Sequence, residues 1–355
     1  MSADPPGVPR LADLGGWPAL LGRLTARKDL TAAEAAAALG DILSGDASAA
    51  QVAGFVVALR MKGETAEEMA GLVRAMVDAA LPVPVTGEVV DTCGTGGDRS
   101  STINISTMAA LVVAGAGATV CKHGGRAATS AAGSADVLEA LGVVIDLGPD
   151  GVLRCLDEAG IGFCFAPRFH PAMRNAIPVR RDLGVPTVFN FLGPLANPAR
   201  PTRQVVGVSD PGMAESMLSV LAANGARRAL VVHGDDGLDE LTTTTTSTVH
   251  DYDAERATPR LTYRVDPAAL GLAPAALADL RGADPRYNAD LVLAVLGGEE
   301  GPRRDVVLLN SAAGLVAAGL AENLEAGIAM AADVIDSGRA RSALDRLVAV
   351  SQAAA

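Results

Sequence analysis

A glycine-rich turn with hydroxyl and acidic side chains follows an apolar segment near residue 90. Gly94-Thr95-Gly96-Gly97-Asp98 comes shortly after Val89-Val90, and Asn104-Ile105-Ser106-Thr107 then opens an apolar stretch. Glycines let backbone amides approach an anion, and hydroxyls at a helix N-terminus add donors within a favourable dipole. The glycine spacing fits neither the dinucleotide fingerprint nor the Walker loop. The segment therefore predicts a phosphate-binding turn of another kind, with a tight capped turn as the alternative.

Two further segments carry charges suited to phosphate and metal. Lys122-His123-Gly124-Gly125-Arg126 precedes small and hydroxyl residues, and it combines a point charge with a guanidinium fork that matches phosphate oxygens. His233-Gly234 leads into an acidic run that ends in the adjacent carboxylates of Asp239 and Glu240. Such a pair can bind a hard divalent cation that also touches phosphate oxygens. Solvated turns are the alternative for both segments.

The composition excludes several classes of protein. The chain has 355 residues, which suggests two domains or a little more. Its net charge of −12 argues against non-specific nucleic-acid binding, which needs a basic surface. No apolar run is long enough to span a bilayer and no signal-peptide pattern opens the chain, so no membrane partner is expected. Four cysteines without metal-ligand spacing indicate reduced thiols and a cytoplasmic location.

The first 84 residues have the pattern of a small helical domain. Three capping boxes, Thr31 with Glu34, Ser48 with Gln51 and Thr65 with Glu68, each predict a helix start, and Gly63 predicts a helix end. A further helix is expected near 17–25, and the first 16 residues, rich in Pro and Gly, are expected to be disordered. A Pro-containing exit at 81–84 predicts a linker.

From residue 85 to 355 the pattern changes to short Val-rich strands that alternate with amphipathic helices. Such alternation favours an α/β domain with a mostly parallel central sheet covered on both faces. Strands are predicted at 88–91, 118–122, 142–146, 186–190, 204–208 and 228–232, and helices include 134–141 and 211–223, the latter capped by Asp210.

Taken together, these motifs resemble the anthranilate phosphoribosyltransferases, a family of nucleoside phosphorylase-like phosphoribosyltransferases. The resemblance covers nearly the whole chain and includes Gly193-Pro194-Leu195 within 190–198. It implies a small N-terminal helical domain, completed by helices from about 170–200, joined to an α/β domain. It also implies a homodimer formed through the helical domain.

The resemblance implies transfer of the phosphoribosyl group of phosphoribosyl pyrophosphate to the amine of anthranilate, a step of tryptophan biosynthesis that releases pyrophosphate. The implied donor-binding residues are Gly94, Gly97, Asp98, Thr102, Asn104, Ser106, Thr107, Lys122, Gly124, Arg126, Ala127, Ala128, Thr129, Ser130 and Ser134. Lys122 and Arg126 would stabilise the leaving group, and no residue is assigned as general base. The acceptor would meet Gly94, His123, Gly125 and Arg180. Ser106, Asp239 and Glu240 would hold magnesium, about two ions per site.

Two positions depart from the pattern of the family. Gly125 stands where an Asn usually approaches the acceptor, and Ala196 replaces a usual Thr. The loss of an amide at position 125 leaves room, so a phosphoribosyltransferase for another aromatic amine or acid is an alternative. A nucleoside phosphorylase of the same architecture and a non-catalytic binding protein are further alternatives, which the acidic pair and the intact phosphate motifs disfavour.

Overall fold

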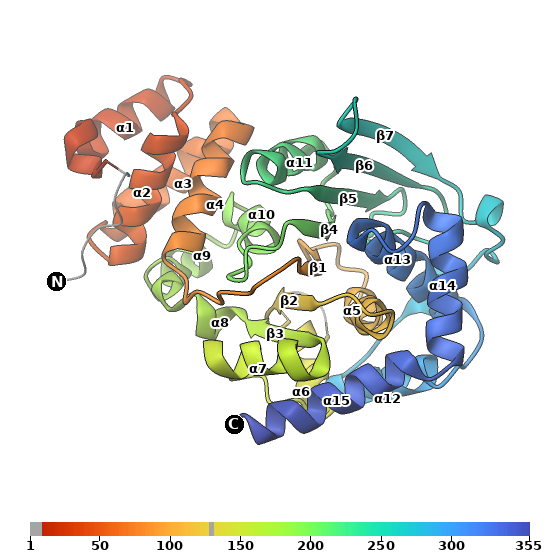
Figure 1. Ribbon diagram of the computed structural model, residues 1–355. Coiled ribbons are helices and arrows are strands. Elements are labelled where there is room, and N and C mark those ends of the chain that lie inside the picture. Colours follow the sequence, from red (N-terminus) through yellow and green to blue (C-terminus); the bar gives the residue numbers. More distant parts are fainter. Residues whose placement is uncertain (1–8, 128–130) are drawn as a thin grey trace.

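The N-terminal helices begin and end at the capping residues that the sequence predicts. The computed structural model describes residues 9–127 and 131–355. Helices α1 (Gly16–Thr25), α2 (Ala32–Ser44), α3 (Ala49–Lys62) and α4 (Ala66–Asp78) form a bundle (Figure 1). The three capping boxes are all present and Gly63 caps the end of α3, so these predictions are confirmed. Disorder of the first 16 residues is wrong for their described part, because Leu11–Leu14 form a 3-10 helix with Leu11 buried. Residues 1–8 lie outside the described residues.

A second segment of the chain packs into the same bundle. It comprises a 3-10 turn (Pro171–Asn175), α9 (Ile177–Leu183), α10 (Phe189–Leu192) and a second 3-10 turn (Gly193–Leu195). Met173, Phe189 and Leu192 share one apolar cluster with Trp17 and Phe55 of the N-terminal helices. The cluster continues to strand and helix residues of the α/β part, so the bundle and the sheet are packed together rather than joined by a free linker.

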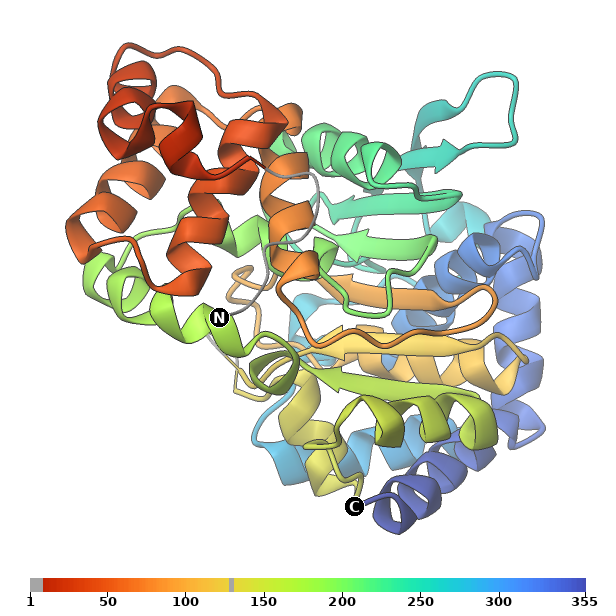
Figure 2. The same ribbon diagram turned by 60° about the vertical axis from the view of Figure 1, so that its left-hand side comes forward.

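Within the described residues, seven strands form one sheet in the order β3-β2-β1-β4-β5-β6-β7. Their bounds are β1 Val90–Gly94, β2 Val120–Gly124, β3 Ile161–Phe165, β4 Arg203–Gly207, β5 Arg228–Gly234, β6 Ser247–Asp253 and β7 Arg260–Val265. The first five are parallel, and β6 and β7 add an antiparallel edge whose turn projects from the molecule in Figure 2. The strand order reverses at β1, between β2 and β4. In open α/β sheets ligands bind at the carboxyl ends of strands at such a reversal.

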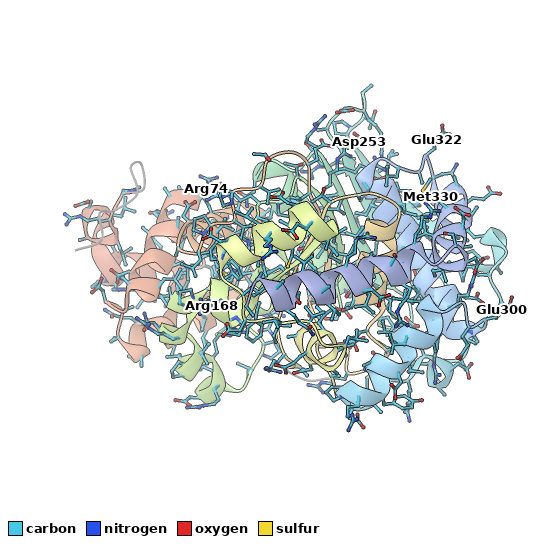
Figure 3. The ribbon with its side chains drawn as sticks, turned by 60° about the horizontal axis from the view of Figure 1, so that its bottom comes forward. Arg74, Arg168, Asp253, Glu300, Glu322 and Met330 are labelled. Carbon is cyan, nitrogen blue, oxygen red and sulfur yellow. The ribbon has the colours of Figure 1, made fainter. Side chains whose placement is uncertain are left out.

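Helices cover the sheet and define its apolar core. Helices α5 (Ile105–Gly115) and α13 (Pro302–Ala318) pack on each other and against β1, whereas α11 (Ala214–Ala223) packs on β5. Helix α15 (Arg339–Ala353) contacts α5 and α7 (Pro149–Ala159) (Figure 3). The other helices are α6 (Ser134–Ala140), α8 (Ala166–Phe169), α12 (Pro285–Leu296) and α14 (Leu324–Asp336). Within the described ranges, no helix has the length and apolar character needed to cross a membrane.

Two predicted strands are wrong and three observed strands were not predicted. The segment 142–146 buries Val143 and Ile145 but joins no ladder, because the amide of Val144 donates to Ser351 Oγ of α15 (3.1 Å). The segment 186–190 turns into α10, and its apolar residues enter the core of the bundle. The unpredicted strands β3, β6 and β7 are discussed below. The other four strands and the helices at 17–25, 134–141 and 211–223 are confirmed within a few residues, although 211–223 begins with a 3-10 turn, Pro211–Met213.

Candidate active site

A cleft of about 500 Å³ lies at the carboxyl ends of β1 and β2, where the strand order reverses. The described candidate residues all line it, although they come from distant parts of the chain: Gly94, Gly97, Asp98, Thr102, Asn104, Ser106, Thr107, Lys122, His123, Gly124, Gly125, Arg126, Ala127, Ser134, Arg180, Asp239 and Glu240. Ala128, Thr129 and Ser130 lie outside the described residues. The fold thus brings both glycine segments, the acidic pair and Arg180 to one place.

The backbone of the first glycine segment, residues 94–98, lines the cleft. Gly96 and Gly97 have φ of +65° and +83°, values that a residue with a side chain rarely adopts. Arg99 and Ser101 share this left-handed region, with φ of +57° and +53°. Non-glycine residues in such conformations concentrate at ligand-binding turns, where the surrounding structure enforces them. Asp98 accepts a hydrogen bond from the hydroxyl of Ser100 within the same turn.

The carboxylates of Asp239 and Glu240 are seated against the two predicted phosphate-binding elements. Asp239 Oδ2 accepts from the amide of Gly96 (2.7 Å), and Glu240 Oε1 accepts from the amide of Ser106 (3.2 Å). Only glycine fits at Gly94 and Gly207, since a Cβ at either position would collide with Asp239. The acidic run therefore inserts between the carboxyl ends of β1 and β4.

Burial makes these carboxylates hard to ionise without a cation. Burial, reinforced by the nearby Asp98 carboxylate, raises the pKa of Asp239 to about 6. Burial and the charge of Asp239 raise the pKa of Glu240 above its ordinary value, and Lys122 opposes that rise. No cluster of three or more His, Cys, Asp or Glu side chains within residues 9–127 and 131–355 is arranged to hold a metal alone. Two carboxylates completed by substrate oxygens are the usual magnesium arrangement, so the donor set fits that ion.

Lys122 provides a buried positive charge beneath the start of α5. Its side chain is 3% exposed, and Nζ donates to Ser106 Oγ (3.2 Å) and to the carbonyl of Thr92. Arg126, the second cation of this motif, lies at the rim instead. It is ion-paired with Asp136 (2.8 Å) and Glu139 (2.9 Å) of α6, so it is not a free cation aimed into the cleft.

The other end of the cleft combines a desolvated guanidinium with aromatic and imidazole rings. The Arg180 guanidinium lies 5.2 Å from the centre of the Phe189 ring, and burial lowers the pKa of Arg180. Among the described residues Arg180 has no carboxylate partner. The rings of His123 and His170 lie 5.1 Å apart. Burial lowers the pKa of His123 to about 3 and that of His170 to about 4, so both are neutral at pH 7.

Several lining residues were not among the candidates. Ala166, Phe189, Asn190 and Pro194 also line the cleft, and of these Phe189 packs against Arg180. The segment 190–198 carries a motif, but only the fold shows that Asn190, Gly193 and Pro194 line the cleft. Apolar residues such as Phe189 carry no sequence signal that separates a cleft wall from a core position.

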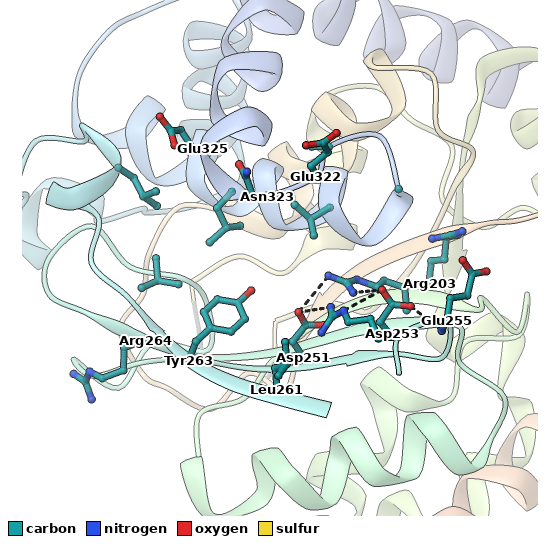
Figure 4. Close-up of a pocket in the computed structure, with 18 of the residues that line it drawn as sticks. Arg203, Asp251, Asp253, Glu255, Leu261, Tyr263, Arg264, Glu322, Asn323 and Glu325 are labelled. Carbon is teal, nitrogen blue, oxygen red and sulfur yellow. Dashed lines mark hydrogen bonds and ion pairs between the residues drawn. The ribbon is translucent and has the colours of Figure 1, made fainter. Parts of the chain in front are cut away.

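A second, larger cavity of about 840 Å³ lies at the opposite ends of the strands (Figure 4). Its arginines are paired: Arg228 and Arg256 with Asp251 and Asp253, and Arg203 with Glu88. Mutual pairing leaves little positive charge for an anionic ligand. None of the candidate residues lines this cavity, so we assign the candidate active site to the cleft at the strand reversal.

Comparison with known proteins agrees with this geometry. Residues 18–80 match the helical bundle domain of a glycosyl transferase family, and residues 86–341 match its α/β domain. The anthranilate phosphoribosyltransferase of Acidothermus cellulolyticus is 56% identical over 97% of both chains. The crystal structure of anthranilate phosphoribosyltransferase from Thermus thermophilus is 43% identical, with a TM-score of 0.88 over 94% of this chain and 99% of that one. The Saccharomyces cerevisiae enzyme, in complex with PRPP and Mg, is 28% identical, with a TM-score of 0.86 over 95% and 98%. The chain belongs to the anthranilate phosphoribosyltransferase family.

Proposed function

We propose that this protein transfers the phosphoribosyl group of phosphoribosyl pyrophosphate to the amine of anthranilate, releasing pyrophosphate. One observation carries the proposal: a glycine turn, a buried lysine, an acidic pair and a guanidinium without a carboxylate partner among the described residues line the same cleft at the strand reversal. The first three suit a diphosphate with its metal, and the last suits a carboxylate. The relatives, which carry this activity in their names, support the same reaction.

The donor would bind between the two glycine segments. Gly97 lines the cleft without a side chain, so its backbone amide can approach phosphate oxygens, whereas the amide of Gly96 is held by Asp239. Ser106 and Thr107 lie in the first turn of α5, where the helix dipole favours negative charge. The buried hydroxyl of Thr107, which has no hydrogen-bond partner in the part of the chain that the structure describes, is a further donor for this role. The S. cerevisiae relative, described in complex with PRPP and Mg, supports the same donor here.

Magnesium would be held by Ser106, Asp239 and Glu240, together with oxygens of the donor, and we propose two ions per site. The bound metal would neutralise charge that develops on the departing pyrophosphate. Lys122 adds a fixed positive charge on the same side of the cleft, beside Ser106 Oγ. Because Lys122 and the loop amides are already in place, they stabilise that charge without reorganisation.

The acceptor would lie at the Arg180 end. A partly buried guanidinium that has no carboxylate partner among the described residues gains a strong bond from an aromatic acid. An arylamine is a neutral nucleophile at pH 7, so attack needs positioning more than a strong base. His123 lines the cleft, and both it and the adjacent His170 are neutral at this pH, so His123 can shape the acceptor end without adding charge.

The purified protein should form N-(5-phosphoribosyl)anthranilate and pyrophosphate from the two substrates, with a requirement for magnesium. The matched control replaces anthranilate with aniline, which keeps the amine and lacks the carboxylate. Turnover of aniline equal to that of anthranilate would contradict the role of Arg180. No pyrophosphate from any aromatic amine in a panel would contradict the reaction itself.

We also propose a homodimer through the helical domain and a cytoplasmic location. Exposed apolar side chains of Val57 and Met61 on α3 and of Ile177 on α9 support the contact surface. The four cysteines are buried and free, which supports a reducing compartment. Light scattering of the purified chain, compared with a Met61→Glu variant, would test the dimer.

A further inference from the structure

Asn288, at the start of α12, lies behind the donor end of the cleft and does not line it. It is 2% exposed and uses both halves of its amide. Its Oδ1 accepts from the backbone amide of Ala283 (2.8 Å), and its Nδ2 donates to Oδ1 of Asn104 (2.9 Å). A buried polar side chain that is fully engaged in this way indicates a specific arrangement rather than a packing accident.

The orientation of both amides follows from the groups at the two ends of this chain of bonds. Asn104 Nδ2 donates to the carbonyl of Ala132 (3.1 Å). The amide of Ala283 can only donate and the carbonyl of Ala132 can only accept, so neither Asn side chain can be flipped. The result is a one-way relay that runs from Ala283 through Asn288 and Asn104 to Ala132.

The relay joins two segments that both line the cleft. Asn104 immediately precedes α5, and its side chain makes no capping bond to that helix. Ala132 precedes Gly133 and Ser134, where α6 begins, and Asp136 of α6 accepts from the amides of both Ala127 and Gly133 (2.9 Å each). The starts of α5 and α6, which form the two walls of the donor end, are therefore connected through the side-chain amide of Asn104.

The segment around Asn288 also supports the donor turn through its backbone. The amide of Ile103 donates to the carbonyl of Leu280, and the amide of Gly282 donates to the carbonyl of Ser101 (2.9 Å each). A Cβ at Gly282 would collide with the side-chain amide of Asn288 and with the backbone carbonyl of Thr102. Residues 101–104 thus rest on the 280–288 segment, and Asn288 supplies the side-chain contact.

We propose that Asn288 is a positioning residue for donor binding, acting only through Asn104, which it orients so that the starts of α5 and α6 keep the spacing that the donor requires. The inference rests on the proposed function, because it takes phosphoribosyl pyrophosphate as the ligand of this cleft. Asn288 itself touches no substrate.

The test is Asn288→Asp, which preserves size and the bond from Ala283 but turns a second acceptor toward Asn104 Oδ1. We expect the Kd for phosphoribosyl pyrophosphate with magnesium, measured by calorimetry, to rise about tenfold, as for loss of one oriented hydrogen bond. The KM for anthranilate should change by less than about twofold. The matched control is Asn175→Asp, which removes a bond to the carbonyl of Leu43 (2.8 Å) in the helical bundle. It should lower the melting temperature without changing the donor Kd.

A double-mutant cycle separates positioning from general destabilisation. The cycle uses the uncharged Asn288→Ser, because the carboxylate of Asn288→Asp would also repel the phosphates of the donor through space. Asn288→Ser alone should raise the donor Kd about tenfold, and in an Asn104→Ala background it should change that Kd by less than about twofold, because its route through Asn104 is gone. Additive effects, or a lowered melting temperature with an unchanged donor Kd, would overturn the proposal. If Asn288→Asp does not fold, Asn288→Ser is judged by the same criteria. Failure of the unmodified protein to bind the donor would instead refute the proposed function, before any variant is compared.

Discussion

At the scale of single residues, the cleft contains ionisable side chains whose charged forms are disfavoured by burial. Asp239 and Glu240 are buried beside each other, and Arg180 is desolvated with no counter-charge among the described residues. Each of these groups is unfavourable in the free protein and becomes favourable when a ligand brings the opposite charge. Neutralising such a group should therefore lower the activity and raise the stability of the free protein.

Asp239→Asn should abolish turnover and yet stabilise the free protein. The Asn oxygen can still accept from Gly96, while the repulsion among Asp239, Glu240 and Asp98 is relieved. The folded-state pKa of Asp239, about 6, exceeds its unfolded value, so its ionisation costs stability as pH rises from about 4 through about 6. We expect the melting temperature of the variant to exceed that of the parent by a few degrees at pH 7, with the difference vanishing near pH 4. Calorimetry on both proteins decides this, and a lower melting temperature for the variant at pH 7 would contradict it.

Arg180→Ala should weaken the acceptor and spare the donor. Loss of a bond between a guanidinium and a carboxylate costs about 1.5–3 kcal/mol, which corresponds to roughly a tenfold to hundredfold rise in the KM for anthranilate. The donor Kd should stay within about twofold, since Arg180 lies at the other end of the cleft. Steady-state kinetics with each substrate varied in turn would show this. An equal loss for both substrates would mean that Arg180 supports the fold of the cleft.

Gly125→Asn tests which acceptor the cleft is shaped for. Among the described residues, a Cβ at this position would meet Ala166 Cβ alone, at 4.0 Å, so these residues leave room for the substitution in the free protein. With anthranilate we expect the specificity constant to be preserved or improved, because an amide is added near the acceptor. The measurement is kcat/KM for anthranilate and for bulkier aromatic amines. A bulkier amine that the parent prefers and the variant rejects would contradict anthranilate as the native acceptor.

At the scale of elements, the site depends on where strands end and helices begin. Gly94, Gly124 and Gly207 end β1, β2 and β4, and the first and third of them make room for Asp239. The first turn of α5 then faces the same space. This cleft tolerates little change in its backbone, because the ends of β1 and β4 both lie very close to Asp239.

Gly97→Val should remove donor binding without unfolding the protein. Gly97 has φ of +83°, which a β-branched residue adopts only with strain. The turn that contains Gly97 lies at the surface of the cleft. We expect no detectable donor binding by calorimetry and a melting temperature within a few degrees of the parent. Gly87→Val, at a positive φ outside the cleft, is the matched control and should keep donor affinity. Unaltered donor affinity in Gly97→Val would mean that the turn is only structural.

At the scale of the whole molecule, features that depend on a few neighbouring residues could be predicted from the sequence. Features that depend on contacts between distant segments could not. The capping boxes act within four residues, and all three were found. Strand β6 was missed because its inward-facing positions include Ser247 and Asp251, so no apolar alternation marks it. Strand β7 is mostly exposed, and β3 is a five-residue run that contains Gly162. The candidate residues could be named from motifs together with the resemblance to the family, but the ion pairs of Arg126 and the support from Asn288 depend on contacts between distant segments.

The buried acidic pair has a consequence for the solution around the protein. Because Asp239 and Glu240 hold protons more tightly than free carboxyls do, formation of a metal-bound complex must expel protons into the solvent. The apparent enthalpy of donor and magnesium binding near pH 6 should therefore depend on the ionisation enthalpy of the buffer. Titrations in MES and in bis-Tris at the same pH, two buffers that differ in ionisation enthalpy, would count the released protons. Asp239→Asn should release fewer, and identical enthalpies in both buffers for the parent would show that the pair is already ionised in the free protein.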